Sequence, residues 1–351
     1  MKNNSVFIIA EAGSNWRMGT LKRDMEMAKT LIDVAAESGA DAVKFQTYRA
    51  HSVYVPNAGD SDYLSEAGIK ESINKIFEDL SMPYEMIPEL AQHSKIKNIE
   101  FMSTPFSVDD AKAINPYTNF HKIASYEISH LRLIEYIAST GKPTFLSTGA
   151  ADKKEIRWAL EKFSSCNGGK ITLLQTTAKY PAPIDSLNLR AMNDLREEFS
   201  EFNVDVGLSD HSINPVIGPV TATALGASVI EKHFTLNKKL PGPDHSFALN
   251  PLELKEMISS IRDTEASLGE NEKKVLDEEF ELRDYAQRTI QCIKPILKND
   301  VFLEGKNIEV LRSGKQKKGL HPRFLEEIQG KRSTRDIPIG DGIMEEDYEK
   351  I

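Results

Sequence analysis

The sequence predicts a (β/α)₈ barrel followed by a small β-rich domain. Over the first four-fifths of the 351 residues, short apolar runs alternate with longer amphipathic segments. The runs are rich in β-branched and aromatic residues and do not alternate strictly, which is typical of parallel strands covered on both faces. Eight such runs suit a barrel of about 250 residues. A doubly wound open sheet is the alternative, but no G-x-G-x-x-G motif follows the first run.

The predicted strands occupy the apolar runs in chain order. They span residues 6–12, 42–47, 100–106, 120–127, 143–149, 171–177, 204–210 and 229–235. Helical spacing fills the gaps: Gly39 stands where a C-cap belongs, and Asp152 and Asn250 are suitable N-cap residues. The helices that these signals delimit span residues 21–38, 152–163 and 250–268.

The chain changes character after the barrel. Residues 270–286 contain many charged residues and few apolar ones, which predicts a solvated helix or a linker. Short strand-like runs and turn signals follow and indicate a separate domain. The expected organisation is therefore a catalytic barrel at 1–269, a linker at 270–286 and a small β-rich domain at 287–351.

Composition and charge restrict the classes of function. The formal net charge of −9 argues against nucleic acid as a partner, because a phosphate backbone attracts clustered Lys and Arg. Cys166 and Cys292 lie far apart and form no disulfide framework, which indicates a reducing compartment. The sequence shows no secretory pattern and no membrane-spanning run, so we expect a soluble cytoplasmic protein without a membrane partner.

Polar residues gather at the ends of the predicted strands. In a barrel, catalytic residues come from the carboxyl ends of strands and the loops that follow. Buried polar groups cost free energy unless they have partners, so a purely structural barrel has no reason to carry many of them. They are Glu11, Asn15, Lys44, Gln46, Ser103, Thr104, Lys122, Ser125, Glu127, Ser147, Thr148, Tyr180, Ser209, Asp210, His211, Glu231 and His233.

Two lysines and two histidines carry most of the chemistry. Lys44 and Lys122 lie inside apolar strand runs, which favours binding of a phosphate or carboxylate over a place on the surface. His211 and His233 end consecutive strands, and paired imidazoles indicate a divalent metal, although a single histidine is more often structural. His245, beside Asp244, is either a further contact or a loop residue.

Nine ordered segments resemble the sialic acid synthase family, which condenses phosphoenolpyruvate with N-acetylmannosamine, its phosphate or a related amino sugar. The resemblance covers residues 6–268, and the C-terminal part resembles the family's antifreeze-protein-like (SAF) domain through NIEVLRSG, GLHP and GKRSTRDIPIGDGIMEED. The barrel segments are IIAEAGSN, VKFQTY, STPF, HKIASYE, LSTG, YPAP, GLSDH, EKHFT and PGPDHS.

The resemblance assigns roles residue by residue. Six residues match positions that hold phosphoenolpyruvate: Lys44, Thr104, Lys122, Ser125, Ser147 and Ser209. Four match positions that hold or act on the acceptor sugar: Gln46, Glu127, Tyr180 and Asp244. His211 and His233 match ligands of a divalent metal, usually Mn²⁺, with Mg²⁺ or Co²⁺ as alternatives. Arg312 matches an arginine that reaches the partner's active site in a domain-swapped homodimer.

The resemblance implies a C–C bond-forming synthase that makes a nonulosonic acid, such as a sialic acid, and releases phosphate. Three places depart from the family: Trp16 replaces a histidine, Ala178-Lys179 precedes Tyr180, and Arg288 lacks a neighbouring arginine. These departures leave the acceptor open among N-acetylmannosamine, its 6-phosphate and a 2,4-diacetamido-6-deoxy sugar. The alternatives are another metal-dependent barrel lyase or hydrolase, and a saccharide-binding protein without catalysis.

Overall fold

The computed structural model describes residues 5–60 and 71–349. The chain forms two compact units, Met1–Gly269 and Glu270–Ile351. The outer limits of the domains predicted from the sequence, residues 1 and 351, lie outside the described residues.

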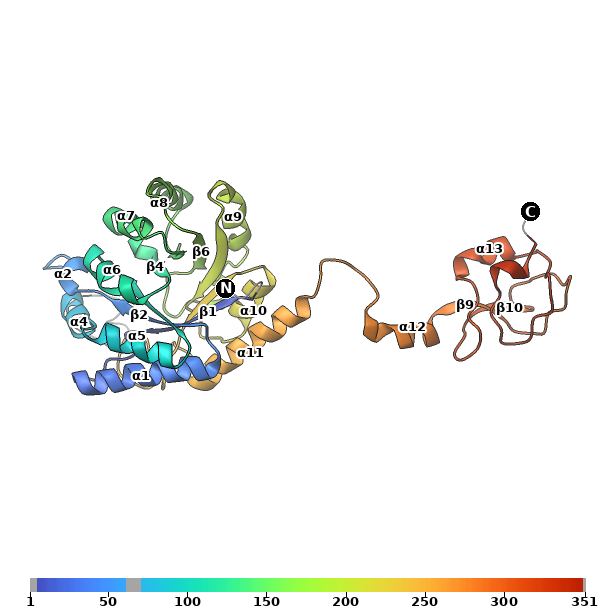
Figure 1. Cartoon of the computed structure of the whole chain (residues 1–351), viewed down its shortest axis with the longest axis horizontal. Coiled ribbons are helices and arrows are strands. Elements are labelled where there is room, and N and C mark those ends of the chain that lie inside the picture. Colours follow the sequence, from blue (N-terminus) through green and yellow to red (C-terminus); the bar gives the residue numbers. More distant parts are fainter. Residues whose placement is uncertain (1–4, 61–70, 350–351) are drawn as a thin grey trace. The chain divides into compact units, whose positions relative to one another are not determined.

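The first unit is a barrel of eight parallel strands. The sheet runs in the order β3-β2-β1-β8-β7-β6-β5-β4, and its two end strands lie side by side, so that the barrel is nearly closed (Figure 1). The (β/α)₈ prediction is confirmed, and the doubly wound alternative is wrong. The strands are β1 (Phe7–Gly13), β2 (Ala42–Thr47), β3 (Glu100–Pro105), β4 (His121–Ile123), β5 (Thr144–Ser147), β6 (Ile171–Thr176), β7 (Asp205–Asp210) and β8 (Val229–His233).

Helices cover the outside of the barrel, and the predicted caps delimit them. Gly39 follows α1 (Leu21–Ser38) at φ 90°, where its N–H bonds the carbonyls of Ala35 and Ala36. Asp152 and Asn250 each complete a capping box, in front of α8 (Lys153–Ser165) and α11 (Pro251–Leu268). The remaining helices are α2 (Ala50–Val53), α4 (Ile73–Asp79), α5 (Met86–Ile96), α6 (Val108–Ile114), α7 (Leu131–Ser139), α9 (Ala191–Glu198) and α10 (Ile217–Ala224).

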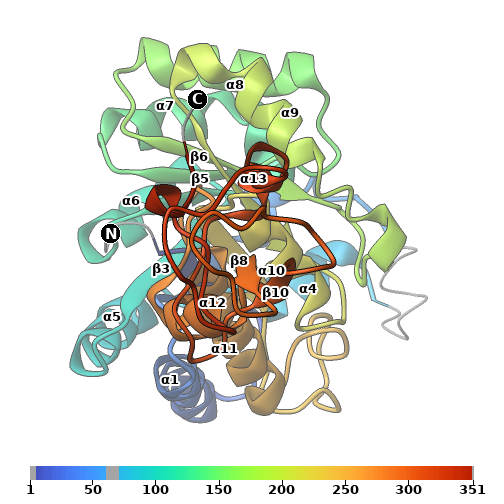
Figure 2. The ribbon, with the colours of Figure 1, turned by 90° about the vertical axis from the view of Figure 1, so that its right-hand side faces the viewer.

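The helices pack in neighbouring groups around the sheet. Helices α1, α5 and α11 lie side by side (Figure 1). In Figure 2, α7, α8 and α9 follow one another along another side, where Lys153 and Arg157 of α8 form ion pairs with acidic residues of α9. The apolar stripes of these helices bury the outer faces of the strands.

The two ends of the lumen differ in chemistry. At the amino end, the rings of Phe7, Phe120 and Phe145 pack together with 5.1–5.8 Å between centroids. Ile9, Met102 and Leu174 belong to the same cluster. This apolar plug leaves the carboxyl end as the place where polar side chains meet.

The fourth strand is shorter than predicted. The sequence suggested a strand over 120–127, but β4 ends at Ile123 and a 3-10 turn spans Ser125–Ser129. Ile123 pairs with Leu146 and β5 ends at Ser147, so at most one further residue could join this ladder. The chain therefore turns, and Ser125 Oγ accepts the backbone N–H of Gly149 at 3.1 Å.

The second unit has its own small core. Strands β9 (Arg288–Cys292) and β10 (Ile308–Arg312) pair in antiparallel fashion. The predicted run TRDIPIGDG contributes isolated bridges at Ile337 and Gly342 rather than a strand. The predicted linker contains the helix α12 (Phe280–Ala286), and α13 (Leu325–Ile328) lies further along the chain. The core residues are Ile290, Cys292, Ile296, Phe302, Ile308, Ile328, Ile337, Ile343 and Tyr348.

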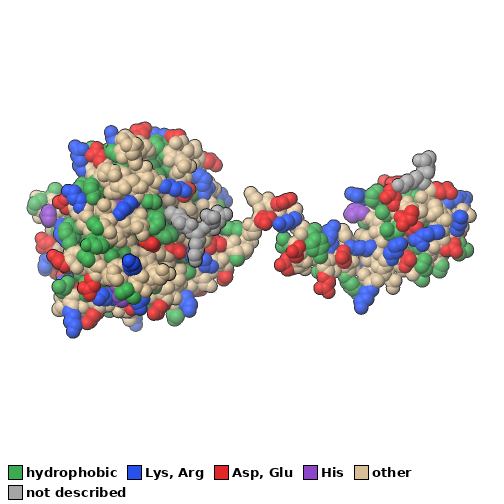
Figure 3. Space-filling model, in the orientation of Figure 1, with side chains coloured by type: hydrophobic (Ala, Val, Ile, Leu, Met, Phe, Trp, Pro, Cys, Tyr) green, Lys and Arg blue, Asp and Glu red, His purple; other side chains and the backbone are tan. Residues whose placement is uncertain are grey.

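The surface carries mixed charge. On the face drawn in Figure 3, Lys and Arg side chains are interspersed with Asp and Glu rather than gathered in one basic stripe. Within residues 5–60 and 71–349, no helix is both long and apolar enough to cross a membrane.

Candidate active site

Lys44 lies at the centre of a buried polar cluster at the carboxyl end of the lumen. It stands on β2 opposite Glu11 of β1, and its Nζ lies 2.6 Å from Glu11 Oε2. The same Nζ donates to Thr104 Oγ1 of β3 at 2.9 Å and lies 3.6 Å from Glu231 Oε1 of β8. Since these residues come from four strands, only closure of the barrel brings them together.

Lys122 approaches the same carboxylate from the opposite side of the barrel. Its Nζ donates to Ser147 Oγ of β5 at 2.7 Å and lies 3.9 Å from Glu231 Oε1. Ser209 Oγ of β7 donates to that oxygen at 3.2 Å. The structure thus brings together five of the predicted phosphoenolpyruvate residues, and all five side chains are buried.

Two lysines and two carboxylates share this buried space, and the pKa values of the two carboxyl groups shift in opposite directions. Burial raises the pKa of Glu11 to about 7 although Lys44 opposes the shift. Burial also acts on Glu231, but Lys122 and Lys44 outweigh it and lower the pKa of that carboxyl. Burial lowers the pKa of Lys122 to about 8, with Lys44 adding to the effect. At neutral pH, Glu11 is therefore the carboxyl that takes up a proton most easily.

His211 and His233 lie next to the lysine cluster and to each other. Their ring centroids are 5.6 Å apart. His211 Nδ1 lies 2.9 Å from the carbonyl of Thr177, and because a carbonyl only accepts, Nδ1 carries the proton and Nε2 keeps its lone pair. Tyr180 stacks on His211 at 4.1 Å, and Phe247 lies 5.2 Å from His233.

The two histidines fit a divalent metal. Burial lowers the pKa of His211 to about 4 and that of His233 well below its usual value, so both imidazoles are neutral, as metal ligands must be. His233 Nδ1 and Glu231 Oε2 are buried without a hydrogen-bond partner in the described chain. Within the described ranges, no three His, Cys, Asp or Glu side chains group as metal ligands. A metal here would therefore take two protein ligands and complete its coordination with substrate oxygens and water.

Asp244 and Gln46 form a second wall of the site. Gln46 Nε2 donates to Glu11 Oε1 at 3.2 Å, and Asp244 Oδ2 lies 3.8 Å from His233 Nδ1. Gly13 sits between them at φ 52°, where a Cβ would lie 2.9 Å from Asp244 Oδ2. Burial raises the pKa of Asp244 to about 6. Because a side chain at Gly13 would displace Asp244, the glycine is needed for this wall to form.

Three predicted site residues stand apart from the cluster. Glu127 lies on the 3-10 turn after β4, and in the described chain its carboxylate makes no hydrogen bond to the lysines. Burial raises its pKa to about 7, with Asp110 adding to the shift. Ser125 bonds Gly149 as described above. Arg312 ends β10 in the second unit, where it is exposed, and its place in the site stays a prediction.

Two further sequence expectations concern neighbouring loops. His245 is buried, and its Nδ1 lies 2.6 Å from Thr235 Oγ1, so this histidine holds its loop. Trp16, which departs from the family pattern, is 1% exposed and belongs to the hydrophobic core. It follows Asn15, whose Nδ2 donates to the carbonyl of Phe234.

Glu11 and Glu231 were recognisable in the sequence as polar residues on predicted strands, but no role was predicted for them. Both lie in buried strands, and a buried charge needs a partner, so the lysines of other buried strands, Lys44 and Lys122, were a usable signal. Phe247 carried no such signal, since an aromatic residue in a loop is as easily explained by packing.

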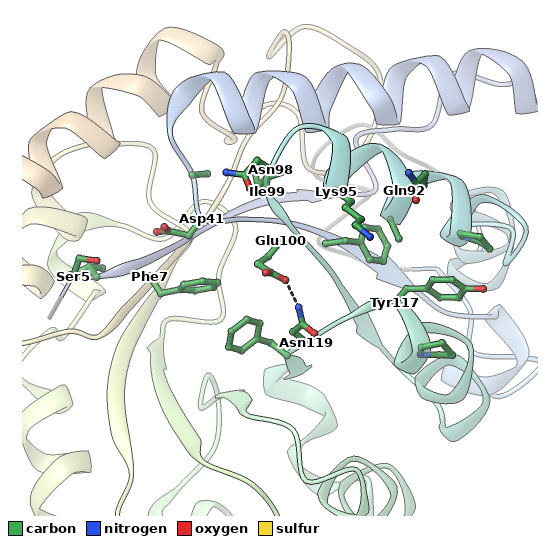
Figure 4. Close-up of a pocket in the computed structure, with 17 residues that line it drawn as sticks. Ser5, Phe7, Asp41, Gln92, Lys95, Asn98, Ile99, Glu100, Tyr117 and Asn119 are labelled. Carbon is green, nitrogen blue, oxygen red and sulfur yellow. Dashed lines mark hydrogen bonds between the residues drawn. The ribbon is translucent and has the colours of Figure 1, made fainter. Parts of the chain in front are cut away.

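A cavity of about 800 Å³ lies at the opposite end of the barrel. Figure 4 shows that Asp41, Glu100, Lys95 and Asn119 surround it at the amino ends of the strands. Two of its polar groups bond each other, since Asn119 Nδ2 donates to Glu100 Oε2 at 2.9 Å. Active sites of barrels lie at the carboxyl ends, so this cavity is not the candidate.

Known proteins are similar to this sequence over nearly its whole length. The spore coat polysaccharide biosynthesis protein SpsE of Bacillus subtilis is 41% identical, over 99% of this chain and 94% of its own. The N,N'-diacetyllegionaminic acid synthase of Campylobacter jejuni is 38% identical, over 96% of this chain and 98% of its own. A pseudaminic acid synthase of Campylobacter jejuni is 35% identical, over 99% and 97%.

Solved structures agree with these relatives. The crystal structure of the Bacillus subtilis SpsE protein superposes with a TM-score of 0.64 at 39% identity, covering 100% of this chain and 97% of that one. The N-acetylneuraminic acid synthetase of Leptospira borgpetersenii has a TM-score of 0.69 at 31% identity, covering 81% and 92%. The NeuB family pattern matches residues 31–273. The chain therefore belongs to the NeuB family, the sialic acid synthase family, whose members related to this chain are nonulosonic acid synthases.

Proposed function

We propose that this protein condenses phosphoenolpyruvate with the open-chain aldehyde of an N-acylated amino sugar, forming a nonulosonic acid and releasing phosphate. One observation carries the proposal: Lys44 and Lys122, both buried, converge with three hydroxyls beside two neutral histidines. A small anion with a phosphate and a carboxylate suits such a cradle, because ammonium groups and hydroxyls bond both kinds of oxygen.

The charge state of the cradle supports the binding of an anion. Lys44 is paired with Glu11, whose pKa lies at about 7. An incoming anion raises that pKa further by repulsion, so Glu11 takes up a proton and releases Lys44 to the ligand. Thr104, Ser147 and Ser209 already lie within hydrogen-bond distance of the charged groups. They then orient the enol phosphate with its methylene carbon towards the acceptor.

The histidines support a metal-assisted reaction. Through His211 Nε2 and the ring of His233 the chain would hold a divalent ion, Mn²⁺ by the family resemblance with Mg²⁺ or Co²⁺ as alternatives. Such an ion supplies Lewis-acid polarisation of a carbonyl oxygen. The rings of Tyr180 and Phe247 around the pair exclude water and keep the imidazoles neutral.

The bond changes follow from the substrates. The methylene carbon of the enol phosphate forms the new C–C bond with the aldehyde carbon through the electrons of the C=C π bond, while the carbonyl π bond breaks and the aldehyde oxygen takes up a proton. Water adds to the carbon that bears the phosphate, and phosphate leaves from the tetrahedral intermediate. Asp244, on the wall next to His233, and Glu127, at the rim, orient the acceptor hydroxyls or transfer protons, and Gln46 holds the acceptor by hydrogen bonds.

The acceptor belongs to the N-acylated amino sugars. Support comes from the relatives named as N,N'-diacetyllegionaminic acid and pseudaminic acid synthases, at 38% and 35% identity, whereas the human N-acetylneuraminate-9-phosphate synthase is 27% identical. We further propose a domain-swapped homodimer in which Arg312 of the second unit completes the acceptor site of the partner.

Phosphate release tests the proposal. Purified protein with Mn²⁺ and phosphoenolpyruvate is given N-acetylmannosamine, its 6-phosphate or a 2,4-diacetamido-6-deoxy sugar, and the product is identified by mass spectrometry. Release that depends on one acceptor and yields the matching nonulosonic acid is expected. Binding of a sugar without phosphate release would favour the saccharide-binding alternative, and acceptor turnover without phosphoenolpyruvate would favour another barrel lyase.

A further inference from the structure

A buried ion pair lies outside the lumen, and each of its two residues is the chain neighbour of one of the two histidines. Asp210 ends β7 and Lys232 precedes His233 on β8, and the two residues are opposite each other in the parallel ladder. Lys232 Nζ lies 2.6 Å from Asp210 Oδ2, with side-chain exposures of 2% and 0%. Side chains alternate along a strand, so this pair faces outward while Glu231 and the histidines face the site.

The ion pair is bonded to the backbone on the far side of His211. Asp210 Oδ1 accepts the N–H of Ser212 at 2.7 Å. Lys232 Nζ donates to the carbonyl of Ser212 at 2.6 Å. Asp210 and Ser212, which flank His211, are therefore both bonded to Lys232, which precedes His233.

The surroundings leave the carboxylate little room to move. Gly218 in the first turn of α10 approaches so closely that a Cβ there would lie 2.7 Å from Asp210 Oδ2. On the other side, the carbonyl of His211 accepts the N–H of Ala182 at 3.0 Å. The backbone around His211 is thus hydrogen-bonded to β8 and to the loop after β6, and α10 packs against the Asp210 carboxylate.

We infer that Asp210 and Lys232 are positioning residues, whose ion pair sets the separation and orientation of His211 and His233 and thereby the affinity for a divalent metal. This inference rests on the proposed function, which makes the histidines metal ligands. An apolar pair of similar volume would be at least as stable when buried, but it would fix no orientation, whereas charge-assisted hydrogen bonds do.

Metal binding to the metal-free full-length protein tests the inference without an activity assay. Mn²⁺ titration followed by electron paramagnetic resonance gives the affinity, and the visible spectrum of the Co²⁺ form reports ligand geometry. The variants are Asp210→Asn, the neutral pair Asp210→Asn/Lys232→Met, and Gly218→Ala. Asp41→Asn is the matched control, since Asp41 pairs with Arg262 at the amino end of the barrel.

Each test variant is expected to bind Mn²⁺ about 10- to 100-fold more weakly and to change the Co²⁺ spectrum, while Asp41→Asn binds like the wild type. Gly218→Ala is the sharpest case: Ala favours a helix more than Gly does, all charges remain, and the atom nearest to the added Cβ is Asp210 Oδ2 at 2.7 Å, with Leu187 Cδ1 at 3.3 Å. It also decides the question if the Asp210 variants do not fold.

Wild-type Mn²⁺ affinity and an unchanged Co²⁺ spectrum in folded Asp210→Asn or in Gly218→Ala would overturn the inference. If His211→Ala abolishes Mn²⁺ binding in the same series, the metal site itself still stands. If the wild type binds no Mn²⁺ and His211→Ala changes nothing, the metal part of the proposed function fails as well.

Discussion

Lys44 Nζ lies 2.6 Å from Glu11 Oε2, so that an ammonium of β2 and a carboxylate of β1 neutralise each other in a space closed to solvent. The same nitrogen reaches Glu231 of β8 at 3.6 Å. Glu11 and Glu231 therefore both pair with a lysine that the proposed substrate also needs. Mutation of this lysine should change both the stability of the fold and the binding of the substrate, so the two effects need separate measurements.

The first prediction concerns Lys44. Lys44→Ala should weaken the use of phosphoenolpyruvate about 10- to 100-fold, since hydrogen bonds to charged groups contribute about 1.5–3 kcal/mol. It should also destabilise the fold by about 3–5 kcal/mol, because Glu11 is left buried without its partner. Lys122→Ala should weaken phosphoenolpyruvate use to a similar extent. Steady-state kinetics and urea unfolding measure the two effects.

A double variant separates binding from stability. Lys44→Ala/Glu11→Gln removes both charges, so the free energy of unfolding should recover while phosphoenolpyruvate use does not. Lys153→Ala, which removes an exposed lysine paired with Asp194, is the control and should behave like the wild type. Unchanged KM and kcat in both Lys44→Ala and Lys122→Ala would remove these lysines from the site.

The second prediction is metal dependence. Treatment with EDTA should abolish phosphate release, and Mn²⁺ should restore it. His211→Ala and His233→Ala should not respond to added Mn²⁺, because each removes one of the two proposed protein ligands. His51→Ala, at an exposed histidine, should keep full activity and metal response. Full activity in a rigorously metal-free preparation would contradict the assignment of both histidines.

The third prediction concerns pH and Glu127. Burial and Asp110 raise the pKa of Glu127 to about 7 from a usual value near 4.5, so the folded state holds this proton more tightly than the unfolded state. Stability from this group is therefore fully present below about pH 4.5 and is lost as the pH rises towards 7, by about 2–3 kcal/mol.

Glu127→Gln cannot ionise and should lack this loss. Its free energy of unfolding, measured with urea at pH 5 and pH 8, should fall less than that of the wild type between the two values. Glu135→Gln, at a surface residue of α7 paired with Arg132, serves as the matched control. An identical pH dependence in wild type and Glu127→Gln would show that the carboxyl ionises freely in the folded protein.

The fourth prediction concerns Arg312. Arg312→Ala should raise the KM for the acceptor without changing the fold, because the side chain is exposed on β10 of the second unit. If Arg312 acts across a homodimer, mixing the Arg312→Ala and Lys122→Ala proteins at low acceptor concentration, where both are impaired, should raise activity after subunit exchange, since each mixed dimer contains one intact site. No recovery despite confirmed heterodimers would make Arg312 a residue of its own subunit or a purely structural one.

Much of the barrel was predictable because its signals are local. Apolar runs without alternation marked the strands, and Gly39, Asp152 and Asn250 marked helix ends to within about two residues. The polar residues at strand ends were likewise predictable as a group, because all carboxyl ends of parallel strands meet at the same end of a barrel. The family resemblance then assigned roles to individual residues.

Pairing and charge state were decided by tertiary structure alone. Nothing local indicates that Lys44 meets Glu11 and Glu231, that β4 stops at Ile123, or that Lys232 faces away from the site. The physical reason is that alternation along a strand gives the side on which a residue lies, whereas the partner across the lumen depends on closure of the whole barrel. The pKa values follow from the same closure, because burial by distant strands is what makes Glu11 hard to ionise and the two histidines neutral.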